Sequence, residues 1–208
     1  MWRAHIDYIK MNAAIIKYNA GNIRSVENAL LRLGAEVVVT DDRETIRKAD
    51  CVLFPGQGEA SNTMNYLRER KLDVLIKSLT QPVLGICIGM QLMCRHSEEG
   101  NTDCLGIFDV DVKKFCPRDN SFKIPHMGWN SLYNLNGALY RDVKEDSFVY
   151  FIHSFYVAQN KWSVADCEYI HPFCASLNKD NFYATQFHPE KSGRVGEQIL
   201  NNFLSLAK

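Results

Sequence analysis

The 208-residue sequence is poor in the features that mark several classes of protein. It has no excess of either charge, since 24 lysines and arginines balance 24 aspartates and glutamates. This balance argues against the basic surface of a nucleic-acid-binding protein. The sequence has no apolar run long enough to span a membrane, and no apolar segment near its first residue that resembles a secretory leader. We therefore expect neither nucleic acid nor membrane as a partner.

The seven cysteines lack the spacing of a disulfide framework or a metal site. Their number is odd, no C-x-x-C pair occurs, and neither cysteines nor histidines fall at the spacings of zinc ligands. We expect free thiols, a cytoplasmic location and no bound metal. The sequence also lacks internal repeats and linkers. We expect one domain over residues 11–208, preceded by a leader or extension over residues 1–10.

From residue 12 onward, strand-like and helix-like segments alternate. Repeated β-α-β units predict an α/β fold, with a mostly parallel sheet, helices on both faces and a smaller β-rich portion in the second half. Asp41 and Glu44 resemble a capping box for a short helix. The predicted strands are 13–18, 36–40, 51–54, 82–87, 148–152 and 182–187, and the main predicted helices are 22–33, 62–79 and 193–207.

The most informative segment is Gly85-Ile86-Cys87-Ile88-Gly89. A cysteine between two glycines, after a strand and before a helix, has the context of a nucleophile elbow. The helix start directs N–H groups at the sulfur and favours the thiolate, which is the attacking species. The alternative is an inert cysteine buried in a core strand.

A second segment supplies the groups that a nucleophilic thiol needs. His188 precedes Pro189, which favours an extended backbone, so the side chains of His188 and Glu190 point to the same side. The carboxylate can then orient the imidazole, and the imidazole can act as the base for Cys87. We therefore predict a Cys87–His188–Glu190 triad.

Two backbone amides are candidates for stabilising an oxyanion. The stronger is that of Ile88, directly after the nucleophile. The loop Gly56-Gln57-Gly58 ends another strand at the same edge of the sheet, and its glycines allow its backbone N–H groups to turn toward a developing oxyanion. The alternative is that this loop is a plain turn.

Together these segments resemble the class I, triad-type glutamine amidotransferases, whose domain is flavodoxin-like. The segment Ile124-Pro125-His126-Met127-Gly128-Trp129-Asn130 is similar to one branch of that family, the glutaminase subunits of imidazole glycerol phosphate synthases. The segments 18–22 and 150–154 support the same branch. The resemblance extends from about residue 11 to the C-terminus.

The resemblance implies that the substrate is L-glutamine and that no cofactor is needed. Cys87 would attack the side-chain amide, the backbone amides of Gln57 and Ile88 would hold the oxyanion, and glutamate and ammonia would be released. Gln91 and Glu99 match family positions that bind the α-groups of glutamine, where an acid suits the ammonium. Backbone groups of Ser154 and Phe155 would help to hold the substrate.

The resemblance also implies a partner, a separate (β/α)8-barrel synthase subunit that receives the ammonia and forms a heterodimer. Trp129, Tyr150 and Lys191 match positions that face this partner, although Trp129 would otherwise be interpreted as a core aromatic. Such subunits are weak glutaminases until the partner binds, and we expect the oxyanion loop to be the switching element. Many relatives carry a small aliphatic residue in place of Gln57, and the sequence after Gly58 also departs from theirs.

Three other interpretations remain open. The same chemistry can feed another synthase, such as one that amidinates surface sugars, uses chorismate or makes vitamin B6. A non-catalytic partner protein can retain the fold, although the intact triad argues against this. A free-standing cysteine peptidase or γ-glutamyl hydrolase would be active without a partner.

Overall fold

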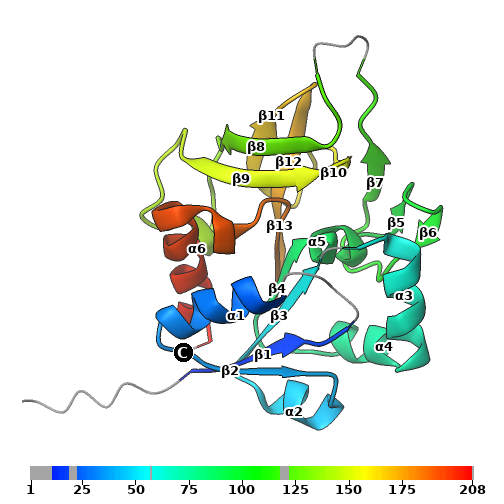
Figure 1. Cartoon of the computed structure of the whole chain (residues 1–208), viewed down its shortest axis with the longest axis vertical. Coiled ribbons are helices and arrows are strands. Elements are labelled where there is room, and N and C mark those ends of the chain that lie inside the picture. The colour runs from blue at the N-terminus through cyan, green and yellow to red at the C-terminus, as the bar shows by residue number, and fades with distance from the viewer. Residues whose placement is uncertain (1–10, 19–22, 57, 118–121, 208) are drawn as a thin grey trace, which may run out of the picture.

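The computed structural model describes residues 11–18, 23–56, 58–117 and 122–207. The predicted extension at residues 1–10 and the predicted helix cap at Asn22 lie outside these ranges. A central sheet crosses the molecule, and helices cover both of its faces (Figure 1). None of the helices in the described ranges is long and apolar enough to cross a membrane.

Five strands form the parallel part of the sheet, in the order β2-β1-β3-β4-β13. β4 pairs with both β3 and β13, so the segments that end at Gly56, Cys87 and Thr185 come together at one edge. Carboxyl ends of parallel strands are where ligands bind in such sheets. The strands are β1 (Asn12–Ile16), β2 (Glu36–Thr40), β3 (Cys51–Gly56), β4 (Val83–Cys87) and β13 (Phe182–Thr185).

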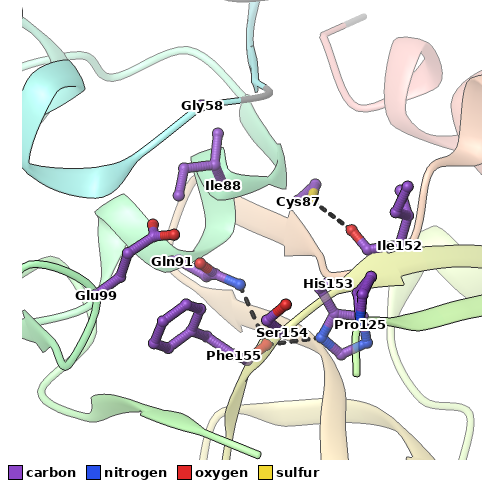
Figure 2. A pocket seen from close by; sticks show the side chains of 10 residues that line it. All are labelled: Gly58, Cys87, Ile88, Gln91, Glu99, Pro125, Ile152, His153, Ser154 and Phe155. Carbon is purple, nitrogen blue, oxygen red and sulfur yellow. Dashed lines mark hydrogen bonds between the residues drawn. The ribbon is translucent and has the colours of Figure 1, made fainter. Parts of the chain in front are cut away.

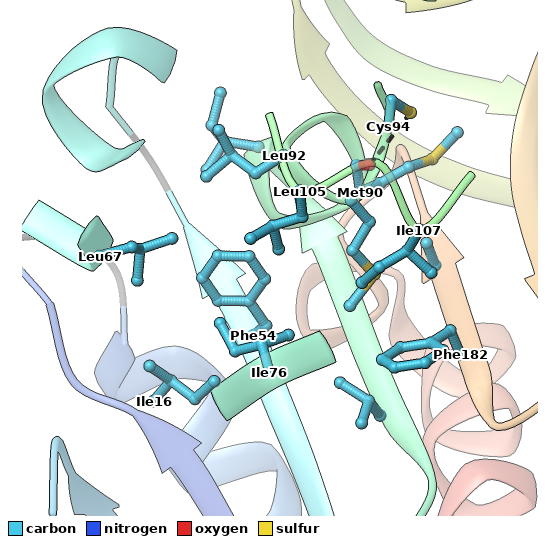
Figure 3. Packing of buried hydrophobic residues seen from close by; sticks show 14 of the residues in the cluster. Ile16, Phe54, Leu67, Ile76, Met90, Leu92, Cys94, Leu105, Ile107 and Phe182 are labelled. Atoms are coloured by element: carbon cyan, nitrogen blue, oxygen red, sulfur yellow. Dashed lines mark hydrogen bonds between the residues drawn. The ribbon is translucent and has the colours of Figure 1, made fainter. Parts of the chain in front are cut away.

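Strand alternation divides the core between the two faces of this sheet. Ile16 and Phe54 point to one side, where they pack with α2–α5 (Figure 3). Ile15 and Leu53, one residue earlier in each strand, pack on the other side with α1 and α6. The helices are α1 (Ile23–Arg32), α2 (Arg43–Lys48), α3 (Ala60–Glu69), α4 (Leu72–Lys77), α5 (Ile88–Met93) and α6 (Gly193–Ser205).

The second half of the chain extends the sheet with mainly antiparallel strands. β12 (Pro172–Lys179) pairs with β13 and continues the sheet through β10 (Phe155–Val157) and β7 (Asp111–Lys114). β5 (His96–Ser97) and β6 (Thr102–Asp103) complete the edge, and β11 (Ser163–Glu168) also pairs with β12. This is the predicted fold class, with its β-rich second portion.

A separate two-stranded hairpin lies over this region (Figure 1). It consists of β8 (His126–Ser131) and β9 (Phe148–His153), with Trp129 opposite Tyr150. β9 contacts α6 and the 3-10 turn η2 (Pro189–Lys191). A second 3-10 turn, η1 (Ala138–Tyr140), packs on α6.

The structure corrects three local predictions. Asp42, not Asp41, caps α2, because its Oδ1 accepts the Thr45 amide at 2.8 Å. The predicted helix over residues 62–79 is two helices, interrupted at Lys71, which has a left-handed φ of 55°. The first strand ends at Ile16 rather than at residue 18.

Candidate active site

Cys87 occupies a sharp turn between β4 and α5. Its φ of 55° and ψ of −108° lie outside the regions that most side chains adopt, so the predicted strained turn is confirmed. Both neighbouring glycines are required by close contacts. A Cβ at Gly89 would overlap the carbonyl oxygen of Phe54, and one at Gly85 would lie 2.9 Å from the Gly89 carbonyl carbon. Gly89 thus lets α5 lie directly against β3, and Gly85 lets it lie against β4.

The sulfur of Cys87 is almost buried and has two polar neighbours. Its thiol donates to the carbonyl oxygen of Ile152 at 3.8 Å, and the amide Nε2 of Gln186 donates to the sulfur at 3.8 Å. Figure 2 shows the first of these contacts across the cavity. Ile152 lies on the hairpin and Gln186 follows β13, so two distant parts of the chain hold the thiol.

The structure brings His188 and Glu190 together as predicted. Nδ1 of His188 lies 2.8 Å from Oε1 of Glu190, and the two side chains are 2% and 1% exposed. Two backbone contacts fix the ring's position: the His188 amide donates to Tyr150 O at 2.9 Å, and Ser192 Oγ donates to His188 O at 2.6 Å. The turn η2 therefore holds the imidazole beside the hairpin.

The electrostatics of His188 connect it to the cysteine. Burial acts to lower the pKa of His188, but interactions with Cys87 and Glu190 outweigh burial and raise this pKa to about 10. Nε2 of the ring is buried and makes no hydrogen bond of ordinary length among the described residues. The Cys87 thiol is thus close enough to the ring to interact with it, and the ring is a strong proton acceptor.

A cavity of about 350 Å³ opens beside the sulfur (Figure 2). Ile88 and all four residues predicted to bind substrate line it, whereas Gln57 lies outside the described residues and its neighbour Gly58 is part of the wall. The lining residues are Gly58, Cys87, Ile88, Gln91, Glu99, Pro125, Ile152, His153, Ser154 and Phe155.

The polar groups of the cavity are firmly held. Nε2 of Gln91 donates to Phe155 O at 3.3 Å and to Oε1 of Gln186 at 3.0 Å. Glu99 accepts the backbone amide of Ala60, the first residue of α3, at 2.9 Å. Partial burial raises the pKa of Glu99, against the opposing effect of that hydrogen bond.

The three residues predicted to face a partner form one group on the outer side of the hairpin. The rings of Trp129 and Tyr150 meet edge to face at 6.1 Å, and Nζ of Lys191 lies 5.9 Å from the centre of the Tyr150 ring. Trp129 is 56% exposed, which rules out the alternative that it is a core aromatic. Met127 and Phe148 are also exposed on this hairpin, so the surface is apolar.

Sequence reasoning missed three side chains that lie close to the site. Gln186 is two residues before His188, and the same alternation that joins His188 to Glu190 was a signal for it. His126 and His153 carried no assigned role. They are opposite one another in the hairpin, which the sequence did not predict because β8 lacks a regular alternation of apolar and polar residues.

Within the described ranges, no group of three or more histidine, cysteine, aspartate or glutamate side chains has the arrangement of a metal site. All seven cysteines have free thiols.

Known proteins match this chain along nearly its whole length. Residues 14–206 match the family model described as glutamine amidotransferase class-I. The chain is 61% identical over 196 residues to the imidazole glycerol phosphate synthase subunit HisH of Bacteroides thetaiotaomicron, covering 94% of this chain and all of that protein. The subunit of the same name from Escherichia coli K12 is 46% identical over 198 residues, which cover 94% of this chain and all of that protein.

Solved structures agree on the fold. A glutamine amidotransferase crystal structure superposes with a TM-score of 0.71 at 17% identity, covering 93% of this chain and 98% of that one. The structure of PurLQS from Thermotoga maritima gives a TM-score of 0.68 at 16% identity, and the match covers 96% of this chain and all of that one.

Proposed function

Because the chain belongs to the class I glutamine amidotransferase family, and within it to the HisH subunits of imidazole glycerol phosphate synthase, we propose that it hydrolyses L-glutamine at Cys87 and delivers the ammonia to a synthase subunit. One observation carries the assignment of the site. The strained Cys87 lines one cavity with the predicted substrate-binding residues, and interaction with its thiol raises the pKa of His188, whose Nδ1 is held by Glu190.

The proposed reaction begins with proton transfer from the Cys87 thiol to Nε2 of His188. The sulfur attacks the side-chain amide carbon of glutamine, and the imidazolium gives its proton to the departing nitrogen, which leaves as ammonia. Water, deprotonated by the same imidazole, then hydrolyses the γ-glutamyl thioester and restores the thiol. Glu190 keeps Nδ1 of His188 protonated and stabilises the imidazolium.

Backbone amides are assigned to stabilise the oxyanion. The amide of Ile88 is at the start of α5, immediately after the nucleophile, where the helix dipole favours negative charge. We assign the second donor to Gln57, on the loop next to Gly58.

Substrate orientation is assigned to the far end of the cavity. Both hydrogens of the Gln91 amide are engaged, so its Oε1 is the atom that can accept from the substrate's α-ammonium. The carboxylate of Glu99 adds the charge that an ammonium requires. Phe155 O already accepts from Gln91 and His153, so Phe155, like Ser154, would act through its N–H group.

The partner is proposed to be a separate (β/α)8-barrel subunit in a heterodimer. The apolar outer surface of the hairpin, with Trp129, Tyr150 and Lys191, is a suitable docking face. Its underlying strand β9 also supplies Ile152 to the cavity, so a subunit docked there could receive ammonia without its release to water. The products there would be imidazole glycerol phosphate and aminoimidazole carboxamide ribotide. Free thiols throughout fit a reducing cytoplasm.

Testing the function requires both subunits. Glutamate release from glutamine should be measured for the wild-type chain and for Cys87→Ser, each with and without the barrel subunit of the same organism. Turnover should be greatest for wild type with the barrel and absent from Cys87→Ser. Equal turnover by the two chains would refute catalysis by Cys87, and full activity without the barrel would indicate a free-standing hydrolase.

A further inference from the structure

Two histidines form a buried hydrogen-bonded pair at the wall of the cavity, which His153 lines. Nδ1 of His126 lies 3.0 Å from Nε2 of His153, and the residues are 3% and 5% exposed. His126 stacks on Phe151 and on Tyr169, with ring centres 4.8 and 4.0 Å apart. The described residues place no carboxylate in hydrogen-bond contact with either ring. The pair is therefore held among aromatic rings.

A backbone carbonyl at one end of the pair determines which ring nitrogens carry protons. Nδ1 of His153 lies 2.6 Å from Phe155 O, and because a carbonyl only accepts, this nitrogen must donate. In a neutral ring the other nitrogen, Nε2, is then an acceptor. Nδ1 of His126 must consequently donate to it, leaving Nε2 of His126 as an acceptor.

Asn130, at the His126 end of the pair, indicates the same donor-to-acceptor direction for these hydrogen bonds. Its Nδ2 donates to the backbone oxygen of Glu168 at 2.8 Å, and its Oδ1 accepts the amide of Ser131 at 2.8 Å, so the amide orientation is fixed. The same Nδ2 lies 3.4 Å from Nε2 of His126, and it can only donate. Every link therefore points from Asn130 toward Phe155.

The chain of contacts continues to the nucleophile. Phe155 O is shared between His153 and Gln91, which uses both lone pairs of that oxygen (Figure 2). Gln91 also donates to Oε1 of Gln186, and Nε2 of Gln186 donates to the sulfur of Cys87. The orientation of both glutamine amides thus depends on where the Phe155 carbonyl lies.

We propose that His126 and His153 are positioning residues: a neutral pair, both protonated on Nδ1, that holds the Phe155 carbonyl and through it orients the Gln91 and Gln186 amides for substrate. This rests on the proposed glutaminase function. The pair touches no reacting atom in this role. It keeps Oε1 of Gln91 directed at the substrate's α-ammonium, so its loss should weaken glutamine binding more than it slows the chemical step.

The first test is spectroscopic and independent of activity. Nitrogen-15 NMR of histidine-labelled full-length protein at pH 7 distinguishes protonated from unprotonated ring nitrogens. Loss of signals in His126→Asn and His153→Asn assigns the two rings. Both should show a protonated Nδ1 and an unprotonated Nε2. A protonated Nε2 at either ring, or a doubly protonated ring, would overturn the proposal even if the enzyme is an active glutaminase.

The second test separates the hydrogen bond from the bulk of the side chain. Asparagine places an N–H group near the position of the histidine Nδ1, whereas leucine of similar shape cannot donate. With the barrel subunit present, His153→Leu should raise the KM for glutamine about tenfold, with kcat within about threefold of wild type. His153→Asn should keep KM within about threefold of wild type.

His171 provides the matched control, since its Nδ1 also lies near a backbone oxygen, that of Pro172, at 3.0 Å. His171→Leu should leave both constants within about twofold of wild type. Equal KM values for His153→Leu and His153→Asn, or a loss confined to kcat, would refute positioning by this pair. A wild-type complex without glutaminase activity would instead refute the function on which the proposal rests.

Discussion

The backbone amide of His188 donates to the carbonyl oxygen of Tyr150 over 2.9 Å, and this bond ties the predicted catalytic base to the hairpin β8–β9. The same strand returns a second bond, because the amide of Tyr150 donates to Ser192 Oγ at 3.0 Å. The Tyr150 ring lies on the exposed face with Trp129. A subunit that docks on that face would therefore press on the strand that positions the imidazole.

Removal of the carboxylate should be less damaging than removal of the sulfur. Glu190→Gln preserves the shape of the side chain but loses the charge that holds Nδ1 of His188 protonated, so we expect kcat to fall about 10²- to 10⁴-fold. Cys87→Ala should lower it by about 10⁶-fold. Steady-state glutaminase assays of the complex would measure both. If the two variants are equally inactive, Glu190 does more than orient the base.

Crowding at the elbow predicts a large loss of stability for Gly89→Ala. The added methyl group would overlap the Phe54 carbonyl, so α5 would have to move away from β3, at a cost of about 2–3 kcal/mol in the free energy of unfolding. Gly106→Ala is a suitable control, because Gly106 has a φ of 69° but open space around it. Backbone strain alone should cost it about 1 kcal/mol. Urea denaturation would compare them, and equal losses would refute the overlap.

The exposed hairpin face predicts a selective loss of partner binding. Trp129→Ala should weaken binding of the barrel subunit by about 2 kcal/mol, or about thirtyfold in Kd, as expected for a central aromatic. The melting temperature should hardly change, because Trp129 is 56% exposed. Leu31→Ala, on α1 at 50% exposure, is the matched control. Calorimetric titration would measure Kd, and unchanged binding by Trp129→Ala would move the interface elsewhere.

The buried histidine pair predicts a loss of stability in acid. Burial lowers the pKa of His126 to about 4, and burial is also the main cause that lowers the pKa of His153 to about 3. In the unfolded chain both histidines titrate near pH 6.5. Between pH 6.5 and 4 the unfolded state therefore binds more protons than the folded state, and the free energy of unfolding decreases as the pH is lowered. Each histidine contributes at most about 1.4 kcal/mol per pH unit.

Urea midpoints at pH 4 to 7 would measure this effect. His126→Asn removes one of the two titrating groups, so its midpoint should fall less steeply with acid than that of the wild type. His171→Asn should follow the wild-type curve. Parallel curves for wild type and His126→Asn would show that His126 is not buried in the neutral form.

The parallel half of the fold was predictable because each of its segments carries a local signal. Residues 36–40 form a β-branched run bounded by turns, and they became β2 with the predicted ends. The helix over 62–79 was predicted as one because its apolar positions continue past the break. Only the left-handed backbone of Lys71 separates α3 from α4, and lysine gives no signal for that conformation.

The β-rich half was less predictable because its pairing is non-local. Residues 172–179 form β12, which is buried on both sides and bonded to three other strands, so its sequence shows no alternation. The position of the Cys87 elbow was visible in the two glycines. The roles of Ile152 and Gln186 were not visible in the sequence. Ile152 acts through its backbone carbonyl, which every residue has, and Gln186 reaches the sulfur only because the fold joins distant segments.

The two faces of β8 carry residues with different proposed roles. His126 and Trp129 point to opposite sides of the hairpin, one inward to the cavity wall and the other outward to solvent. A slip of one residue in the pairing with β9 would exchange the two sides of the strand. Glutamine binding and binding of the second subunit would then be lost together. Both therefore depend on the correct register of a single six-residue strand.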